Sequence, residues 1–323
     1  MTGGAGYVGS ICTQHLCGEG WEVVVYDSLV AGHADAVTVN LIRGDVRDTE
    51  HLTEALSSGF DAVVHLAAYI SVAQSVSEPE TFHEVNVGGT ASLIEAMRAT
   101  GTRHVVFASS VSVYGNPGAE AIDESHPLDP ASPYATTKML GESLLERASM
   151  EGALTAASLR FANICGASDD GSLGERHEPE THLVPLALRA AVGGHLMTVH
   201  EASAATPDGT GVRDYVHVED IAAAIHSALR HLCAGHEGGV WNIGTGRGTT
   251  TLQILEGAEQ VTGRRIARTA APPRAGDVPW LLADVTKART ELQWTARRSV
   301  VDAIESAYAW EQTLASTPHS SDQ

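Results

Sequence analysis

The opening of the chain constrains its fold most. Gly3, Gly6 and Gly9 follow one another in GxxGxxG spacing, directly before a helix-like run. In a strand-to-helix turn the first glycine permits the tight turn, the second lets backbone approach phosphate, and the third lets the helix pack against the sheet. Asp27 closes the next β-rich run, where a carboxylate can accept hydrogen bonds from ribose hydroxyls and repel a 2′-phosphate. The two features together predict a dinucleotide site that favours NAD over NADP.

Hydrophobic periodicity predicts the surrounding fold. Short β-rich runs at 22–27, 39–45, 61–66 and 104–109 alternate with helix-like stretches such as 84–100. This alternation is typical of βαβ units on a parallel sheet. We therefore expect an α/β fold with a doubly wound, Rossmann-type parallel sheet and a smaller C-terminal substrate-binding lobe.

The domain boundaries follow from changes in composition. We assign 1–166 to the NAD-binding domain, with further sheet strands from about 214–248. The less periodic segment 167–213, together with 249–313, is expected to form the substrate lobe. The polar residues 314–323 are expected to be a frayed tail.

Composition argues against several classes of protein. Lys and Arg total 20 against 40 acidic residues, and this net charge of −20 opposes nucleic-acid binding. The longest apolar runs fall far short of the roughly 20 residues that a membrane span needs. No signal-like N-terminus is present, and the four cysteines lack zinc-type spacing. We expect a cytoplasmic protein with reduced thiols and no nucleic-acid or membrane partner.

Histidines are numerous, 16 in all, and raise the question of a metal site. His177 and His182 lie among acidic residues, but their spacing matches no compact metal motif such as HExxH. We predict no metal ion and interpret this segment as a solvated lid over the bound ligand.

A second group of residues predicts catalysis. A Ser-Pro pair at 132–133 starts a helix, which places Tyr134 and Lys138 one turn apart on the same face. A neighbouring ammonium and a cationic nicotinamide would lower the pKa of the tyrosine toward the working range. Ser110 lies in a hydroxyl cluster at the end of the 104–109 run, where a doubly wound sheet places its ligand crevice. Tyr134 is therefore a candidate general base.

These motifs resemble extended short-chain dehydrogenases/reductases and, within them, the UDP-glucose (UDP-galactose) 4-epimerase family. The resemblance covers nearly the whole chain through TGGAGYVGS, SSVSVYG, SPYATTK and, most specifically, PDGTGVRDYVH at 207–217. It implies that Tyr134 deprotonates the sugar 4-hydroxyl, that Lys138 binds the nicotinamide ribose, and that Ser110 hydrogen-bonds the reacting oxygen. NAD would stay bound because the reaction has no net redox change.

The resemblance also implies two sets of binding residues. Those for the cofactor, NAD, are Gly3, Gly6, Tyr7, Val8, Asp27, Ser28, Asp45, Val46, Leu66, Ala67, Ala68, Asn86, Tyr134, Lys138 and Phe161. Those for a UDP-sugar are Ser110, Tyr134, Asn163, His182, Leu183, Thr198, His200, Arg213, Tyr215, Arg274 and Asp277. A homodimer through the helices that begin near residues 84 and 134 is implied as well.

Related chemistries differ at positions visible in the sequence. Sugar-nucleotide dehydratases carry an acidic pair directly after the catalytic hydroxyl, where this chain has Val111 and Ser112. The glutamate usual in this segment of UDP-glucuronate decarboxylases is also absent. Epimerisation is therefore favoured. Leu281, near the position that limits room for an N-acetyl group, leaves hexose, N-acetylhexosamine and other UDP-sugars open.

This chain departs from the family at several places. Ser71 stands where many members have lysine, His182 where some use asparagine, and His200-Glu201 replace a more apolar segment along the uracil. A catalytically weak NAD-binding regulatory protein of the same fold is the alternative function.

The first strand of the family is missing. Members begin with about five apolar residues before the glycine turn, and omitting them, at about 1.5–3 kcal/mol each, would remove on the order of 10 kcal/mol, comparable to the net stability of a domain. We expect that the natural reading frame starts upstream of Met1. The alternative is a fold with a gap beside residues 23–26. Intact mass and Edman sequencing of protein from the native locus distinguish the two.

Overall fold

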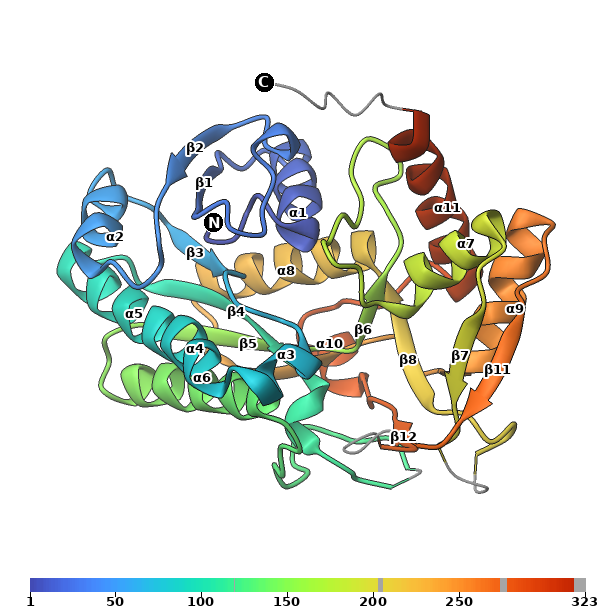
Figure 1. Cartoon of the computed structure of the whole chain (residues 1–323). Helices are drawn as coiled ribbons and strands as arrows, with labels where there is room; N and C mark the ends of the chain where they lie inside the picture. Colours follow the sequence, from blue (N-terminus) through green and yellow to red (C-terminus); the bar gives the residue numbers. More distant parts are fainter. Residues whose placement is uncertain (119, 203–205, 274–277, 317–323) are drawn as a thin grey trace.

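A parallel sheet with helices on both faces forms the larger part of the molecule (Figure 1). The computed structural model describes residues 1–118, 120–202, 206–273 and 278–316. The strands of this sheet are β1 (Val24–Asp27), β2 (Asn40–Arg43), β3 (Ala62–His65), β4 (His104–Ser110), β5 (Thr155–Phe161) and β9 (Gly239–Ile243). β1 pairs with β2, and β3, β4, β5 and β9 follow one another, all parallel. The predicted α/β fold with a parallel, Rossmann-type sheet is confirmed.

Thr2 joins the two parts of the sheet. It forms parallel bridges to Tyr26 in β1 and to His65 in β3, where a full central strand would lie. Its amide donates to Val64 O at 2.9 Å, and its carbonyl accepts from Leu66 N at 3.0 Å. Beyond Thr2 a pocket lined mainly by apolar side chains, including Val24, continues between the two strands. This pocket lies where the alternative expectation placed a gap, beside residues 23–26.

Alternate residues of the sheet supply two hydrophobic cores. Val106 packs with α1 (Tyr7–Gly18) and α8 (Val218–Cys233) on one face. Phe107 packs with α2 (Thr49–Leu56), α5 (Gly89–Thr100) and α6 (Pro133–Met150) on the other. This alternation follows from the two-residue period of a strand. The short elements α3 (Val72–Ser77), α4 (Pro79–Phe82) and a π-helical turn (His83–Gly88) lead into α5, and single 3₁₀ turns occupy Ala34–Ala36 and Val111–Tyr114.

The remaining strands form two small sheets beside the main one. β8 (Val212–His217) lies at the centre of the first and pairs with β6 (Asn163–Cys165), β10 (Gly248–Thr250) and β12 (Trp280–Leu281). β7 (Met197–His200) pairs with β11 (Arg268–Ala271) in the second. Within the stretch 214–248, β9 therefore joins the main sheet, whereas β8 does not.

Among the described residues, four helices accompany the two small sheets. They are α7 (Leu183–Gly193), α9 (Thr251–Thr262), α10 (Thr286–Glu291) and α11 (Val300–Ser316). α7 packs on α9 and α11 and encloses a third core (Figure 1). α11 continues through Ser316, past the expected start of the tail, and its inner face is buried at Ala307 and Trp310. Within the described ranges, every helix is too short or too polar to cross a membrane.

His65 makes the central sheet sensitive to acid. Its ring is buried between the hydroxyls of Thr2, at 2.7 Å, and Thr90, at 3.2 Å. Burial, with a smaller contribution from Lys138, lowers the pKa of His65 to about 3. Below about pH 6.5 the unfolded chain therefore binds a proton at His65, whereas the folded chain does not bind it until a much lower pH. We expect stability to fall from that pH downward by up to about 1.4 kcal/mol per pH unit from this residue. Urea midpoints from pH 7 to pH 4.5 would measure this, and His65→Gln should flatten the slope; an unchanged slope would contradict it.

Candidate active site

The glycine turn is shaped by close contacts. Gly3 has φ of +72°, and a Cβ there would lie 2.5 Å from Ala67 N. A Cβ on Gly9 would lie 2.1 Å from Gly3 O. Packing alone therefore requires glycine at these two positions. Gly6 differs, because the nearest atom to a Cβ there would be 3.5 Å away, an ordinary contact. Packing within the protein therefore does not explain why residue 6 is a glycine, and the space beside it is open to a ligand.

The first turn of α1 faces this space. Gly6 is its N-cap, and no described side chain caps the helix. Uncapped amides at a helix start, with the helix dipole, favour an anion such as a phosphate. Asp27, at the end of β1, accepts hydrogen bonds from Ala5 N and Leu29 N, both at 2.9 Å. The carboxylate is thus fixed beside the turn and retains lone pairs for further donors. These features fit the pyrophosphate and ribose of a dinucleotide.

The other residues predicted for the cofactor lie at one edge of the main sheet. Ser28 follows β1, Asp45 and Val46 follow β2, Leu66, Ala67 and Ala68 follow β3, and Phe161 ends β5. Carboxyl ends of parallel strands meet at one edge, which is where open α/β sheets bind ligands. Tyr7 and Val8 begin α1, and the Tyr7 hydroxyl donates to Gly166 O at 2.6 Å.

Ser110, Tyr134 and Lys138 come together at this edge. Ser110 ends β4, and the other two lie one turn apart on α6, which starts at Pro133 with a Ser132 cap. Lys138 Nζ donates to Ala108 O at 2.8 Å and lies 5.9 Å from the centre of the Tyr134 ring. Lys138 is buried, which lowers the pKa of its ammonium to about 8 against the opposing charge of Glu142.

The pKa of Tyr134 was predicted to be lowered by Lys138 together with a bound, cationic nicotinamide. In the protein alone burial raises the pKa of its phenol to about 12, although a hydrogen bond with Ser110 acts in the opposite direction. Desolvation thus dominates without the cofactor, and the effect of a bound nicotinamide stays a prediction. The protein alone therefore keeps Tyr134 protonated at neutral pH.

A buried network that the sequence analysis missed supports the catalytic helix. Glu142, on α6, accepts 2.9 Å and 2.6 Å hydrogen bonds from Arg160 of β5. It also accepts a very short one from Ser109 of β4. Arg160 donates to the Tyr114 hydroxyl at 2.7 Å. Glu142 follows Lys138 by one helical turn, so a carboxylate on this otherwise buried face was the available signal.

Asn86 lies beside the site, but its side chain is occupied by the protein. Its amide exchanges hydrogen bonds with Tyr69 N, at 2.8 Å, and Tyr69 O, at 3.0 Å. Its second amide hydrogen is donated to Thr137 at 2.9 Å. Asn86 therefore fixes the loop after β3 to α6. Tyr69 and Thr137 did not emerge from the sequence.

Three residues predicted for the UDP-sugar gather around β8. Arg213 and Tyr215 belong to this strand, and Asn163 of β6 lies opposite Tyr215 in register. Leu281 of β12 lies opposite Arg213. Asn163 is exposed, Arg213 is half-buried, and Tyr215 is buried.

The other predicted substrate residues are more dispersed. His182 caps the start of α7, and Leu183 is its first residue. Thr198 and His200 lie on β7, where His200 Nδ1 is 2.8 Å from Pro272 O. Arg274 and Asp277 lie outside the described residues.

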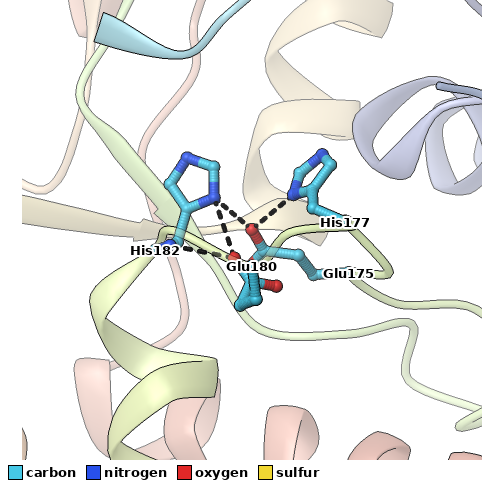
Figure 2. A group of neighbouring side chains, drawn as sticks. All are labelled: Glu175, His177, Glu180 and His182. Carbon is cyan, nitrogen blue, oxygen red and sulfur yellow. Dashed lines mark hydrogen bonds and ion pairs between the residues drawn. The ribbon is translucent and has the colours of Figure 1, made fainter. Parts of the chain in front are cut away.

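The segment predicted to be a solvated lid is instead partly buried. Figure 2 shows His177 and His182 turned toward the carboxylates of Glu175 and Glu180. The side chains of these two glutamates are only 7% and 2% exposed. Burial opposes both charges, yet the two histidines lower the pKa of Glu175 to about 2. The two carboxylates raise the pKa of His182 to about 10, again against the effect of burial. Spacing along the sequence gave no sign of this cluster, because the turn of the chain brings its members together.

Comparisons with known proteins agree with this geometry. Residues 1–244 match the model of the NAD dependent epimerase/dehydratase family. The chain is 42% identical over 318 residues to a UDP-glucose 4-epimerase of Lactobacillus helveticus, covering 97% of this chain and 96% of that protein.

Solved structures give the same result. A UDP-glucose 4-epimerase from Brucella ovis in complex with NAD superposes with a TM-score of 0.92 at 40% identity, covering 95% of this chain and 96% of that one. One from Stenotrophomonas maltophila, with bound NAD and formylated UDP-arabinopyranose, has a TM-score of 0.94 at 33% identity, covering 97% of each chain. The full-length matches agree with the glycine turn, which has room for a phosphate, and with the tyrosine and lysine on one helix. The chain therefore belongs to the NAD dependent epimerase/dehydratase family, as an extended short-chain dehydrogenase/reductase.

Proposed function

We propose that this protein is an NAD-dependent 4-epimerase that interconverts UDP-glucose and UDP-galactose. The placement of Ser110, Tyr134 and Lys138 at the sheet edge, beside the glycine turn, supports this most directly. NAD, when bound, would supply the acceptor and then the donor of the hydride at C4 of the sugar, whose opposite face would be presented for the return. The chain's own residues must then move one proton and hold a 4-keto sugar.

Tyr134 exchanges that proton. Tyr134 must be a tyrosinate before the reaction starts: its oxygen takes the proton of the sugar 4-hydroxyl as the C4 hydride leaves, and the resulting phenol gives the proton back when the hydride returns. Ser110 supplies the hydrogen bond that favours this anion. Lys138, buried next to the ring, supplies the nearby positive charge. A catalytic pKa works best near the operating pH. Since burial alone raises that of Tyr134 to about 12, an added positive charge in the site would bring it closer to the operating pH.

Retention of the cofactor is a requirement of this reaction, because no net redox change occurs. A contact between two loops fits that role. Arg176 pairs with Asp35 at 2.5 Å, and His33 Nε2 lies 2.9 Å from Arg176 O. The loop after β1 is thereby joined to the loop that leads into α7. We propose that this contact slows loss of NAD.

The small sheet around β8 is the proposed UDP-sugar site. Arg213 and Asn163 would hold the diphosphate, since guanidinium pairs bidentately with phosphate oxygens. His182 and Leu183 would contribute from the start of α7, and Thr198, His200 and Tyr215 from their strands. Arg274 and Asp277 are assigned to the diphosphate and uridine ribose by resemblance. Leu281 lies opposite Arg213 and would limit room at the sugar.

The direct test is C4 inversion. Purified protein is incubated with UDP-galactose and, separately, UDP-N-acetylgalactosamine, and proton NMR follows the product. We expect inversion of UDP-galactose without added cofactor. Faster inversion of the N-acetylated sugar would assign that substrate instead. NAD released on denaturation without any turnover would favour a regulatory, cofactor-binding protein.

Two glycine substitutions separate cofactor binding from folding. Gly6→Ala places a methyl group where the protein has room, so the chain should fold with near-normal stability. That methyl would occupy the space proposed for phosphate, so we expect NAD content after purification to fall at least tenfold. Gly9→Ala brings a Cβ to within 2.1 Å of Gly3 O and should destabilise the fold itself. Thermal melting and NAD released by denaturation measure the two effects. Full NAD content in folded Gly6→Ala would contradict the proposed phosphate position.

We further propose a cytoplasmic homodimer that associates through the region of α5 and α6. α3, which packs on α6, exposes Val72 and Val76 by 50% and 66%. Such adjacent apolar side chains are typical of an interface. Analytical ultracentrifugation of Val72→Glu against the unchanged protein tests the dimer.

A further inference from the structure

The segment 175–182 carries two imidazoles and two carboxylates outside the catalytic trio. Glu175, His177, Glu180 and His182 each offer a ligand atom, and these atoms all lie within 4.8 Å of one another. Figure 2 shows that they converge from one turn of the chain onto a common point. We propose that these four residues form a binding site for one divalent transition-metal ion, for which Zn²⁺ is the probe.

The spacing of the donors fits a four-coordinate ion. Zinc–ligand distances of about 2.0–2.1 Å separate neighbouring ligand atoms by about 3.3–3.4 Å in a tetrahedron. Glu175 Oε1 lies 3.0 Å from His177 Nδ1 and 2.5 Å from His182 Nδ1. Glu180 Oε1 lies 3.4 Å from His182 Nδ1. Small side-chain movements would bring all four donors to the required separation.

One ligand atom of the cluster lacks a hydrogen-bond partner in the described part of the chain. Within the described residues, Glu180 Oε2 is buried and makes no hydrogen bond, whereas His182 Nδ1 is paired with Glu175 Oε1 at 2.5 Å. The side chain of Glu180 is 2% exposed, so water cannot readily satisfy it. Buried polar atoms in folded proteins are nearly always paired, and an orphaned one requires an explanation. A metal ion bound beside Glu180 would satisfy this oxygen.

Charge balance is compatible with an ion at this place. Two buried carboxylates close together are costly unless positive charge compensates them. In the ion-free protein His182, whose pKa the carboxylates raise to about 10, supplies part of that charge. Arg189 is 4.0 Å from Glu180 Oε2 but pairs more closely with Glu311, at 2.8 Å. A dication with two neutral imidazoles and two carboxylates is neutral overall.

The donor set narrows the class of metal. Imidazole with carboxylate suits zinc and other divalent transition metals, whereas calcium and magnesium prefer oxygen ligands alone. The position also gives the ion a role. His177 meets the Tyr7 ring of the glycine turn edge-on, with 6.3 Å between ring centres, and His182 caps α7. The bound ion would fix the loop between the proposed cofactor site and the proposed sugar-nucleotide site.

Metal titration of the tag-free, chelator-treated protein tests the proposal. Zn²⁺ is added in competition with a chromophoric chelator, and Mg²⁺ serves as the hard-cation control. We expect one Zn²⁺ per chain and no competition by Mg²⁺. His177→Asn and Glu180→Gln should each weaken zinc binding at least tenfold. Absence of stoichiometric binding would overturn the proposal.

A second cluster provides the matched control. His15, Glu19 and His226 also lie close enough to share an ion, but they offer three donors instead of four. His226→Asn should leave zinc affinity unchanged. Loss of binding in His226→Asn, with none in His177→Asn, would place the ion elsewhere and overturn the assignment.

Cobalt substitution tests the site in the unmodified protein and so does not depend on whether a variant folds. Co²⁺ in the unmodified protein should show the intense visible bands of four-coordinate cobalt. A sulfur-to-cobalt charge-transfer band should be absent, because all four donors are nitrogen or oxygen. Weak six-coordinate bands, or a sulfur band from the exposed Cys17 or Cys233, would contradict the site.

Discussion

Tyr134→Phe is expected to lower kcat by about 10²–10⁴-fold, the range typical of general acid–base groups. The change removes one hydroxyl and leaves the ring that Lys138 approaches. Packing of α6 should therefore persist, and the variant should retain its NAD. NMR of C4 inversion measures the rate, and denaturation releases the cofactor for assay.

The control for this variant is Tyr308→Phe, which removes the same hydroxyl from half-buried Tyr308 on α11. It should leave kcat within about twofold, since it lies outside the catalytic trio. Turnover of Tyr134→Phe at the unmodified rate would remove Tyr134 from the proposed mechanism. Loss of both turnover and NAD would instead indicate a structural role.

Arg160→Leu is expected to destabilise the folded protein by about 3–5 kcal/mol, because it leaves a buried carboxylate without its partner. Arg160 and Glu142 are only 5% and 8% exposed, and the pair joins β5 to the catalytic helix. The substitution also removes the hydrogen bond that Arg160 donates to the Tyr114 hydroxyl. Urea denaturation of NAD-free protein measures the loss.

Arg147→Leu is the matched control, since it removes another arginine–glutamate pair from the same helix. Arg147 is 79% exposed, and its partner Glu151 is 42% exposed. Exposed pairs of this kind contribute about 0.3–0.5 kcal/mol. Equal losses in the two variants would show that burial does not set the contribution of the Arg160 pair.

The sequence predicted most of the fold because the signals are local. Each β-rich run became a strand of the parallel sheet, and the Ser-Pro pair began α6 as expected. Alternation along a strand and a cap before a helix depend only on neighbouring residues. The same holds for the glycine turn, whose first and last glycines are required by contacts within the turn and with the adjacent strand end.

Long-range partners could not be read in this way. Glu142 meets Arg160 only because β5 lies beside α6, and Asn86 meets Tyr69 only because a loop returns over the π-helical turn. The pKa of Tyr134 was predicted from Lys138 and a bound nicotinamide, and no pattern in the sequence indicated that burial, a property of the whole fold, raises it in the protein alone.

The residue types and spacing alone determined the family resemblance, the sheet and the identity of the proposed catalytic trio. The tertiary structure alone decided three things: that Thr2 bridges β1 and β3, that β8 leaves the main sheet, and that Glu175, His177, Glu180 and His182 converge. The physical reason is common to all three. Hydrogen bonds across strands and desolvation of clustered charges depend on which distant segments pack together, and periodicity along the chain carries no information about that pairing.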